Sequence, residues 1–166
     1  MDTYKLKARQ RPLKEKYRDD PQAALVTLSA DGQLADTEVS CAVQVGRQIA
    51  DADLHPAAGG DGTLACSGDM LLQALVACAG VTLRAVATAR GLDVTGSVRA
   101  EGDLDFRGTL RASPDVPVGF RAIRLRFDLD TAASPQDVAQ LLATTEQCCV
   151  VLQTLTNGVP VTITHR

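Results

Sequence analysis

The strongest constraint on the fold is an apolar segment in the middle of the chain, from Asp69 to Arg90. Its side chains are apolar around nearly the whole of a helical wheel, and Gly91 follows where glycine commonly ends a helix. A helix that is apolar on every side is normally buried in a protein core. The longest apolar stretch, Met70 to Leu83, is shorter than the ~20 residues that cross a bilayer. We therefore expect one buried central helix and no membrane.

Shorter patterns on either side of this segment predict the remaining elements. Apolar residues at helical spacing indicate an N-terminal helix, and alternation of apolar and polar residues indicates strands, most clearly from Phe120 to Asp130. Ser134 followed by Pro135 is typical of a helix start. Expected helices cover residues 3–18, 134–145 and 146–155, and expected strands cover residues 24–29, 34–45, 94–105, 120–130 and 161–164, with a hairpin turn at 31–32 and a loop at 51–61. This order predicts an α+β fold with a mostly antiparallel β-sheet packed against the central helix.

Length and charge limit the possible functions. A chain of 166 residues is long enough for one domain with a hydrophobic core. Its net charge of −3 argues against nucleic acid as the main partner, because that binding needs clustered Lys and Arg. No apolar run follows the first residues, so we expect no signal peptide and a cytoplasmic protein.

Five cysteines raise the question of whether some of them do chemistry. In a reducing compartment an odd number of cysteines is poor support for a disulfide scaffold. A structural zinc site is not expected, because there is no Cys-x-x-Cys pair and the adjacent Cys148 and Cys149 cannot both turn easily toward one ion. The sequence therefore predicts neither a metal nor a cofactor, which leaves the thiols themselves.

Cys78 lies inside the apolar segment and has two interpretations. It is either a small hydrophobic packing residue or a reactive thiolate, and a thiolate needs a nearby positive charge or hydrogen-bond donor. Arg84 is nearly two helical turns away, and the sequence does not show whether it reaches the sulfur. His55, in the Gly-rich loop, is either a donor to a thiolate or substrate or an ordinary loop residue. Cys41 is expected to be a packing residue, and Cys66 is either a packing residue or a third redox thiol.

Two motifs resemble the OsmC/Ohr family of osmotically inducible and organic hydroperoxide resistance proteins. The segment from Cys66 to Arg84, which contains Cys78, looks like the core helix of that family. The later run Glu-Gln-Cys-Cys-Val-Val-Leu-Gln-Thr-Leu, which contains Cys149, is similar to its second cysteine motif. The resemblance covers about residues 22–166 and leaves residues 1–21 as an N-terminal helical extension.

The resemblance implies a fold and an activity. Members form an intertwined homodimer with active sites at the subunit interface. They are thiol-dependent peroxidases, in which a first cysteine, here Cys78, becomes a sulfenic acid and a second, here Cys149, forms a disulfide with it. The implied partners are an organic hydroperoxide substrate and a small or protein dithiol reductant. The alternative is a protein of the same fold that binds a small ligand or transfers thiol or sulfur without peroxidase turnover.

The resemblance also implies supporting residues, and here the sequence departs from the family pattern. Members use an Arg–Glu pair to stabilise the thiolate. Asp69 stands where one branch has its Glu, although Asp at a helix start is also a common cap. Arg47 and Arg84 are the candidates for the Arg. Val150 replaces the proline that usually follows the second cysteine, and Cys148 adds a thiol that is an alternative disulfide partner.

Overall fold

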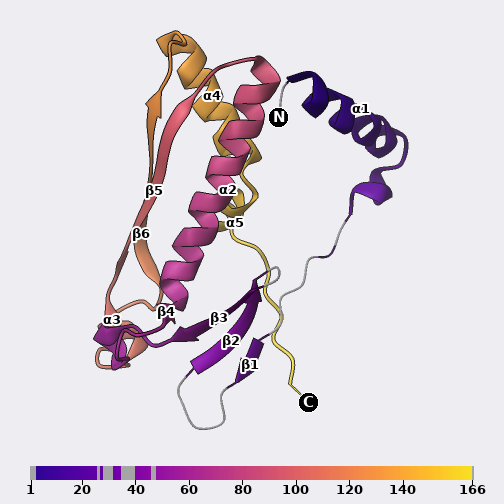
Figure 1. The fold of residues 1–166 in the computed structure, drawn as a ribbon. Coiled ribbons are helices and arrows are strands. Elements are labelled where there is room, and N and C mark those ends of the chain that lie inside the picture. The colour runs from indigo at the N-terminus through magenta and orange to yellow at the C-terminus, as the bar shows by residue number, and fades with distance from the viewer. Residues whose placement is uncertain (1–2, 26, 28–31, 35–39, 46–47, 166) are drawn as a thin grey trace. The chain divides into compact units, whose positions relative to one another are not determined.

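The computed structural model describes residues 3–25, 27, 32–34, 40–45 and 48–165. Its residues group into two compact units. The first comprises Met1–Gln22, Ala74–Arg99 and Arg126–Arg166, and the second comprises Ala23–Gln73 and Ala100–Leu125. The long helix α2 (Ser67–Arg90) and the paired strands β5 (Thr95–Leu104) and β6 (Phe120–Asp130) contribute to both units (Figure 1).

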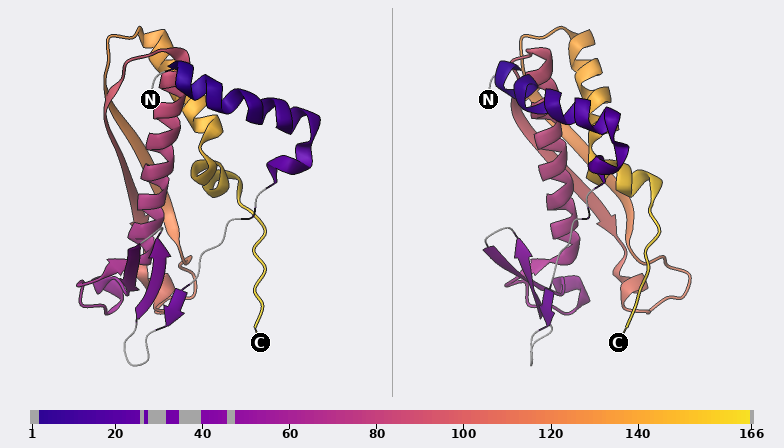
Figure 2. Two further views of the ribbon diagram at one scale, coloured as in Figure 1. Left: turned by 45° about the vertical axis from the view of Figure 1, so that its right-hand side comes forward. Right: turned by 90° about the vertical axis from the view of Figure 1, so that its right-hand side faces the viewer.

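Helices dominate the first unit. It contains α1 (Thr3–Asp19), the greater part of α2, α4 (Pro135–Cys148) and α5 (Val150–Asn157). The views of Figure 2 show α4 running beside α2. The hydrophobic core lies between them and is formed by buried Leu83, Ala87, Val94 and Leu141, with Val86, Leu92, Phe127, Leu129 and Leu142 packed against it. Helix α1 is tied to α2 by the Thr3 hydroxyl, which donates to the Thr88 carbonyl oxygen at 2.7 Å.

Helix α2 is buried along one stripe only, which corrects the expectation of a helix buried on all sides. Its buried residues, Leu75, Ala79, Leu83 and Ala87, recur every four positions and so share one face. Other apolar residues point outward, and Val81 is 72 % exposed. By length and hydropathy α2 would also suffice to span a bilayer. The expectation that the apolar stretch is too short to cross one is therefore wrong. Core helices of soluble proteins meet the same test, and the buried stripe packs on residues of its own chain.

The second unit is built on a four-stranded sheet, β1-β2-β3-β4. Strands β1 (Gly32–Leu34), β2 (Ser40–Val45) and β3 (Gln48–Asp53) pair antiparallel, and the short β4 (Ala65–Cys66) pairs parallel with β3. A 3-10 turn, η2 (Pro56–Ala58), and the short helix α3 (Phe106–Thr109) complete this unit. Together the units form an α+β fold with a long helix on antiparallel strands.

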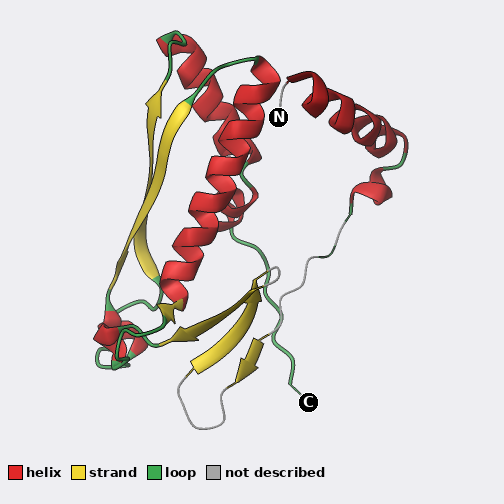
Figure 3. Cartoon of the chain, viewed as in Figure 1, coloured by secondary structure: helices red, strands yellow, loops and turns green. Residues whose placement is uncertain are grey.

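The structure corrects several local predictions. Ala24, placed in a strand by its sequence, ends the 3-10 helix η1 (Pro21–Ala24), and Gly32 belongs to β1 instead of a hairpin turn. The start of the predicted 51–61 loop completes β3, and α3 was not predicted. No strand forms at residues 161–164, although their apolar alternation suits one; Figure 3 draws the segment as loop.

Candidate functional site

The candidate site lies in the first unit, where α2 meets the junction of α4 and α5. Cys78, on α2, is half-buried, and Cys149 is fully buried at 0 % exposure. The Cys149 thiol donates a hydrogen bond to the Cys78 sulfur. Two cysteines that are 71 positions apart in the sequence (149 − 78) are therefore neighbours in the folded chain.

The junction between α4 and α5 determines where Cys149 lies. Cys149 is the only residue between the two helices and has an extended backbone, with φ −77° and ψ 104°. Its N–H donates to Thr145 O at 2.9 Å, which completes α4, and its carbonyl oxygen accepts from Gln153 N at 2.9 Å, which starts α5. The N–H groups of the first turn of α5 have no partner within the helix, so they are available to a neighbouring group.

Hydrogen-bond donors make Cys78 more acidic than an ordinary thiol. Partial burial by itself raises the pKa of Cys78, but donors to the sulfur outweigh it and leave the pKa below its usual value. These donors are the N–H of Val151, the Cys149 thiol, the Thr82 hydroxyl and the N–H of Val150. Two of them belong to the first turn of α5, where the helix dipole also favours negative charge. These donors favour the ionised form of Cys78 more than the surroundings of an ordinary thiol do.

The pKa of Cys149 changes in the opposite direction. Burial raises the pKa of the Cys149 thiol, and the neighbouring Cys78 raises it further, which together outweigh the lowering by the N–H groups of Leu152 and Val151. Of the two thiols, Cys78 therefore loses its proton more readily, and Cys149 retains its proton more readily. This division of roles is the one that a nucleophile and a second, initially protonated thiol require.

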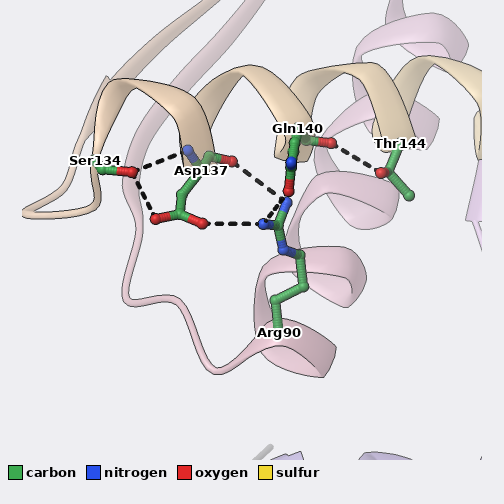
Figure 4. Close-up of polar contacts among 5 residues, drawn as sticks. All are labelled: Arg90, Ser134, Asp137, Gln140 and Thr144. Carbon is green, nitrogen blue, oxygen red and sulfur yellow. Dashed lines mark hydrogen bonds and ion pairs between the residues drawn. The ribbon is translucent and has the colours of Figure 1, made fainter.

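A polar cluster fixes α4 against the end of α2 and so helps to place Cys149 (Figure 4). Ser134 caps α4 by accepting from Asp137 N at 3.1 Å, and its hydroxyl donates to the Asp137 carboxylate at 2.6 Å. Arg90, in the last turn of α2, donates to that carboxylate at 3.1 Å and to Gln140 Oε1 at 2.9 Å. The cap and the ion pair together link the end of α2 to the start of the helix that carries Cys149 at its other end.

Arg84, one of the two arginines proposed from the sequence, makes its hydrogen bond away from the sulfur. Arg84 donates to the carbonyl oxygen of Val94 and lines an apolar cavity of about 400 Å³ together with Gly80 and Leu129. Gly80 comes two residues after Cys78, about 200° further round the helix, so this cavity opens on another side of α2. Arg47 lies outside the described residues.

His55 and Asp69 lie together in the second unit. They line a cavity of about 350 Å³ with Cys66 and Phe106. His55 caps η2 by accepting from Ala57 N through Nδ1 at 3.0 Å, and its ring stacks on Phe106 with centroids 4.8 Å apart. Asp69 is exposed in the first turn of α2, where a carboxylate suits the helix dipole.

The other cysteines differ in accessibility. Cys148, the last residue of α4, is exposed although its neighbour Cys149 is completely buried. Cys66 is half-buried, and Cys41 lies in β2 among the residues whose side chains are not described. Among the described residues, no group of His, Cys, Asp and Glu is arranged to hold a metal ion.

Sequence reasoning missed the donors around Cys78. Thr82 follows Cys78 by four residues, so helical spacing alone places both on one face of α2 and was a usable signal. The N–H groups of Val150 and Val151 carried no side-chain signal. Their role depends on where α5 begins and on which neighbour its first turn meets, and both are set by tertiary packing.

Comparison with known proteins identifies the family. The OsmC-like protein family matches residues 60–164, which is more than half of the chain. No curated protein matches the sequence. The OsmC-like protein from Mycoplasma pneumoniae superimposes with a TM-score of 0.68 at 16 % identity, over 80 % of this chain and 89 % of that chain.

Two solved organic hydroperoxide resistance proteins have the same fold. The protein from Elizabethkingia anophelis superimposes with a TM-score of 0.63 at 14 % identity, over 81 % of this chain and 91 % of that one. The protein from Legionella pneumophila gives 0.55 at 21 % identity, over 80 % and 90 %. At these identities the likeness concerns the fold alone, and the family match extends it to the sequence: the chain belongs to the OsmC-like family.

Proposed function

We propose that this protein reduces organic hydroperoxides with a dithiol as the electron donor, using Cys78 as the nucleophile and Cys149 as its disulfide partner. The observation that carries the proposal is the contact between the two sulfurs at the first turn of α5. The solved relatives named organic hydroperoxide resistance proteins support the same chemistry for this fold.

The reaction takes place in three balanced steps. The Cys78 thiolate attacks the distal peroxide oxygen, the O–O bond breaks, and the alkoxide leaves and takes a proton to become an alcohol, which leaves Cys78 as a sulfenic acid. The Cys149 thiol then attacks the Cys78 sulfur, so that a disulfide forms and water leaves. A dithiol finally reduces the disulfide to two thiols and is itself oxidised to a disulfide.

In this proposal hydrogen bonds replace the arginine that the family resemblance implied. A thiolate is stabilised by any positive potential or donor that points at it, and helix N-termini are a common source of both. Val150 N–H, Val151 N–H and the Thr82 hydroxyl supply that stabilisation within one unit of the chain. A pair in which the Asp69 carboxylate orients the Arg47 guanidinium toward the thiolate stays a separate prediction from the family resemblance.

The surroundings of Cys78 favour an organic substrate over hydrogen peroxide. Val81 follows Cys78 by three residues and so is its neighbour on the helix surface. Val81 is 72 % exposed and Val150, beside the donating amides, is 70 % exposed. An apolar group attached to the peroxide would cover these side chains, and each buried methylene contributes about 0.8 kcal/mol.

We also propose that the chain works as a homodimer in the cytoplasm. Outside its buried stripe α2 leaves apolar residues uncovered, and the segment after α5 exposes Val161 and Ile163 at 80 % and 92 %. Alternating exposed apolar residues without a paired strand suit pairing with a strand of a second copy. A cytoplasmic location would supply the reduced dithiols that the third step consumes.

The test of the proposed function is hydroperoxide consumption by the purified full-length chain with cumene hydroperoxide and dithiothreitol. We expect turnover by the wild-type protein, loss to the background of free dithiol in Cys78→Ser, and at least a tenfold reduction in Cys149→Ser. Cys66→Ser is the matched control, because Cys66 is a half-buried thiol on a different element, and it should keep wild-type turnover.

No turnover above the dithiol background in the wild-type protein would contradict the proposal. Ligand binding or thiol transfer by a protein of this fold would then be the better account. Turnover that survives in Cys78→Ser would assign the activity to another thiol and would equally reject Cys78 as the nucleophile.

A further inference from the structure

Cys148 has no role in the reaction described so far, yet it is the residue directly before Cys149, the fully buried thiol of the site. We propose that Cys148 is the exit thiol of the cycle: it attacks the Cys149 sulfur of the Cys78–Cys149 disulfide and passes the oxidation to the surface as a Cys148–Cys149 disulfide. This inference rests on the proposed peroxidase function and adds a third catalytic thiol to it.

Access is the first argument. Thiol–disulfide exchange requires an attacking sulfur to approach one sulfur of the disulfide directly. The Cys149 side chain has 0 % exposure, so a dithiol in solution does not reach its sulfur in this fold. Cys148 is exposed and adjacent in the chain, so it combines access to solvent with proximity to Cys149.

The second argument concerns which sulfur of the disulfide is attacked. Exchange is faster when the departing thiolate is the more stable one. Attack at the Cys149 sulfur releases the Cys78 thiolate, which is stabilised by the donors from α5 and Thr82. Attack at the Cys78 sulfur would instead release a thiolate at Cys149, where burial raises the pKa. The favoured target is therefore the buried Cys149 sulfur, which lies next to the exposed Cys148 in the chain.

The geometry of the product explains why it is short-lived. Adjacent residues have Cα atoms about 3.8 Å apart, less than the 4.4–6.8 Å of ordinary disulfides. A Cys148–Cys149 disulfide is therefore strained and readily reduced. It would form where α4 ends and Cys149 is extended, so the small ring does not interrupt a helix interior. The exchange is energetically uphill and is drawn forward by the external dithiol.

The electrons balance without a further reactant. The Cys148 thiolate forms a bond to the Cys149 sulfur, the Cys78–Cys149 bond breaks, and Cys78 leaves as a thiolate ready for the next peroxide. The external dithiol then transfers two electrons and two protons to the exposed Cys148–Cys149 disulfide and becomes a disulfide itself. The hydroperoxide is the oxidant and the dithiol is the reductant throughout.

The test separates the oxidising half of the cycle from the reducing half in the full-length chain. Cumene hydroperoxide is mixed with wild-type protein, Cys148→Ser and the control Cys66→Ser, first without reductant and then with dithiothreitol. We expect all three to consume the first equivalent of peroxide at the same rate. With dithiothreitol, Cys148→Ser should turn over at least tenfold more slowly, and Cys66→Ser should turn over like wild type.

Peptide mapping gives a second measurement on the same samples. Trypsin places Cys148 and Cys149 on one peptide and Cys78 on another. Oxidised wild-type protein that is acid-quenched early in reduction should contain some of the first peptide with its own internal disulfide, and Cys148→Ser should contain only the cross-linked peptides. Wild-type turnover by Cys148→Ser would overturn the exit role and leave the peroxidase proposal intact, whereas a wild-type protein that consumes no peroxide would reject both.

Discussion

Cys78 and Cys149 carry the same side chain, and their surroundings make them chemically different. Cys78 accepts hydrogen bonds from the first turn of α5 and from Thr82, which lower its pKa against the effect of burial. Cys149 is buried more completely and faces the charge of Cys78, so its pKa is raised. At neutral pH a larger fraction of Cys78 is ionised, and Cys78 should therefore be the thiol of this pair that reacts first.

The Thr82 hydroxyl should contribute measurably to that difference. A hydrogen bond to a charged group contributes about 1.5 kcal/mol, which corresponds to roughly tenfold in thiolate population. Thr82→Val keeps the shape of the side chain and removes the donor, so iodoacetamide alkylation of Cys78 near pH 7 should slow about tenfold and its pH profile should move to higher pH. Thr144→Val, which loses a hydroxyl bonded to Gln140 O on α4, is the control. An unchanged pH profile in Thr82→Val would show that the Thr82 hydroxyl does not lower the pKa of Cys78.

Helix α5 is short, and its N-terminus is the part that carries function. The extended backbone of Cys149 ends α4 and starts α5 in a single residue, so the free N–H groups of the new helix face α2. The family resemblance led us to expect a proline at the position of Val150. A proline there would suit the first turn of the helix but would remove one of the donors to Cys78.

Val150→Pro therefore tests whether backbone N–H groups acidify Cys78. The variant should fold, because Val150 is exposed and the residue before it already has the extended conformation that precedes proline. We expect the alkylation profile of Cys78 to move to higher pH, with several-fold slower reaction near pH 7. Val150→Ala trims the same side chain and keeps the N–H, so it should react like wild type. Equal profiles for the two variants would mean that the Val150 N–H is not a donor to the sulfur.

Helix α4 depends on its cap more than on its surface ion pair. Ser134→Ala removes the cap acceptor, and the free energy of unfolding should fall by about 1 kcal/mol in urea titrations. Ser134→Thr retains the acceptor, so its free energy of unfolding should fall much less. Arg90→Gln should cost less than 1 kcal/mol, because the Arg90–Asp137 pair is partly exposed. A Ser134→Ala variant as stable as wild type would show that the start of α4 is held by packing alone.

The chain leaves apolar surface uncovered on α2 and on the segment after α5. The buried stripe of α2 takes up only one face of that helix, and the segment after α5 ends without a paired strand. The proposed homodimer accounts for both features, because a second copy would cover the apolar faces and would supply a strand to pair with the segment.

The double variant Val161→Asp/Ile163→Asp tests the role of that segment. Charges on its apolar face should convert most of a dimer to monomer in sedimentation velocity measurements, since buried unpaired carboxylates are costly. Thr162→Asp/Thr164→Asp adds the same charge to the alternate face of the segment and should leave the dimer in place. The proposal fails if the wild-type chain is already monomeric, or if both double variants sediment alike.

The sequence was most informative where a local pattern determines a local structure. The central helix, the strands after it and the Ser134 start of α4 were predicted closely, because periodicity and capping are properties of neighbouring residues. The missing final strand and the single buried stripe of α2 were not, because both depend on what packs beside the element. Cys78 and Cys149 were proposed from their motifs, and the donors around Cys78 emerged only from the contact of α2 with α5.

The most direct test of the account is a single turnover without reductant. Reduced protein is mixed with a less-than-equimolar amount of cumene hydroperoxide, and thiol loss and disulfide mapping are followed together. The account predicts that the peroxide is consumed far faster than by a free cysteine thiol, with loss of two thiols per peroxide and a disulfide between Cys78 and Cys149. Consumption at the rate of free cysteine, or a stable oxidised Cys78 with no link to Cys149, would contradict it.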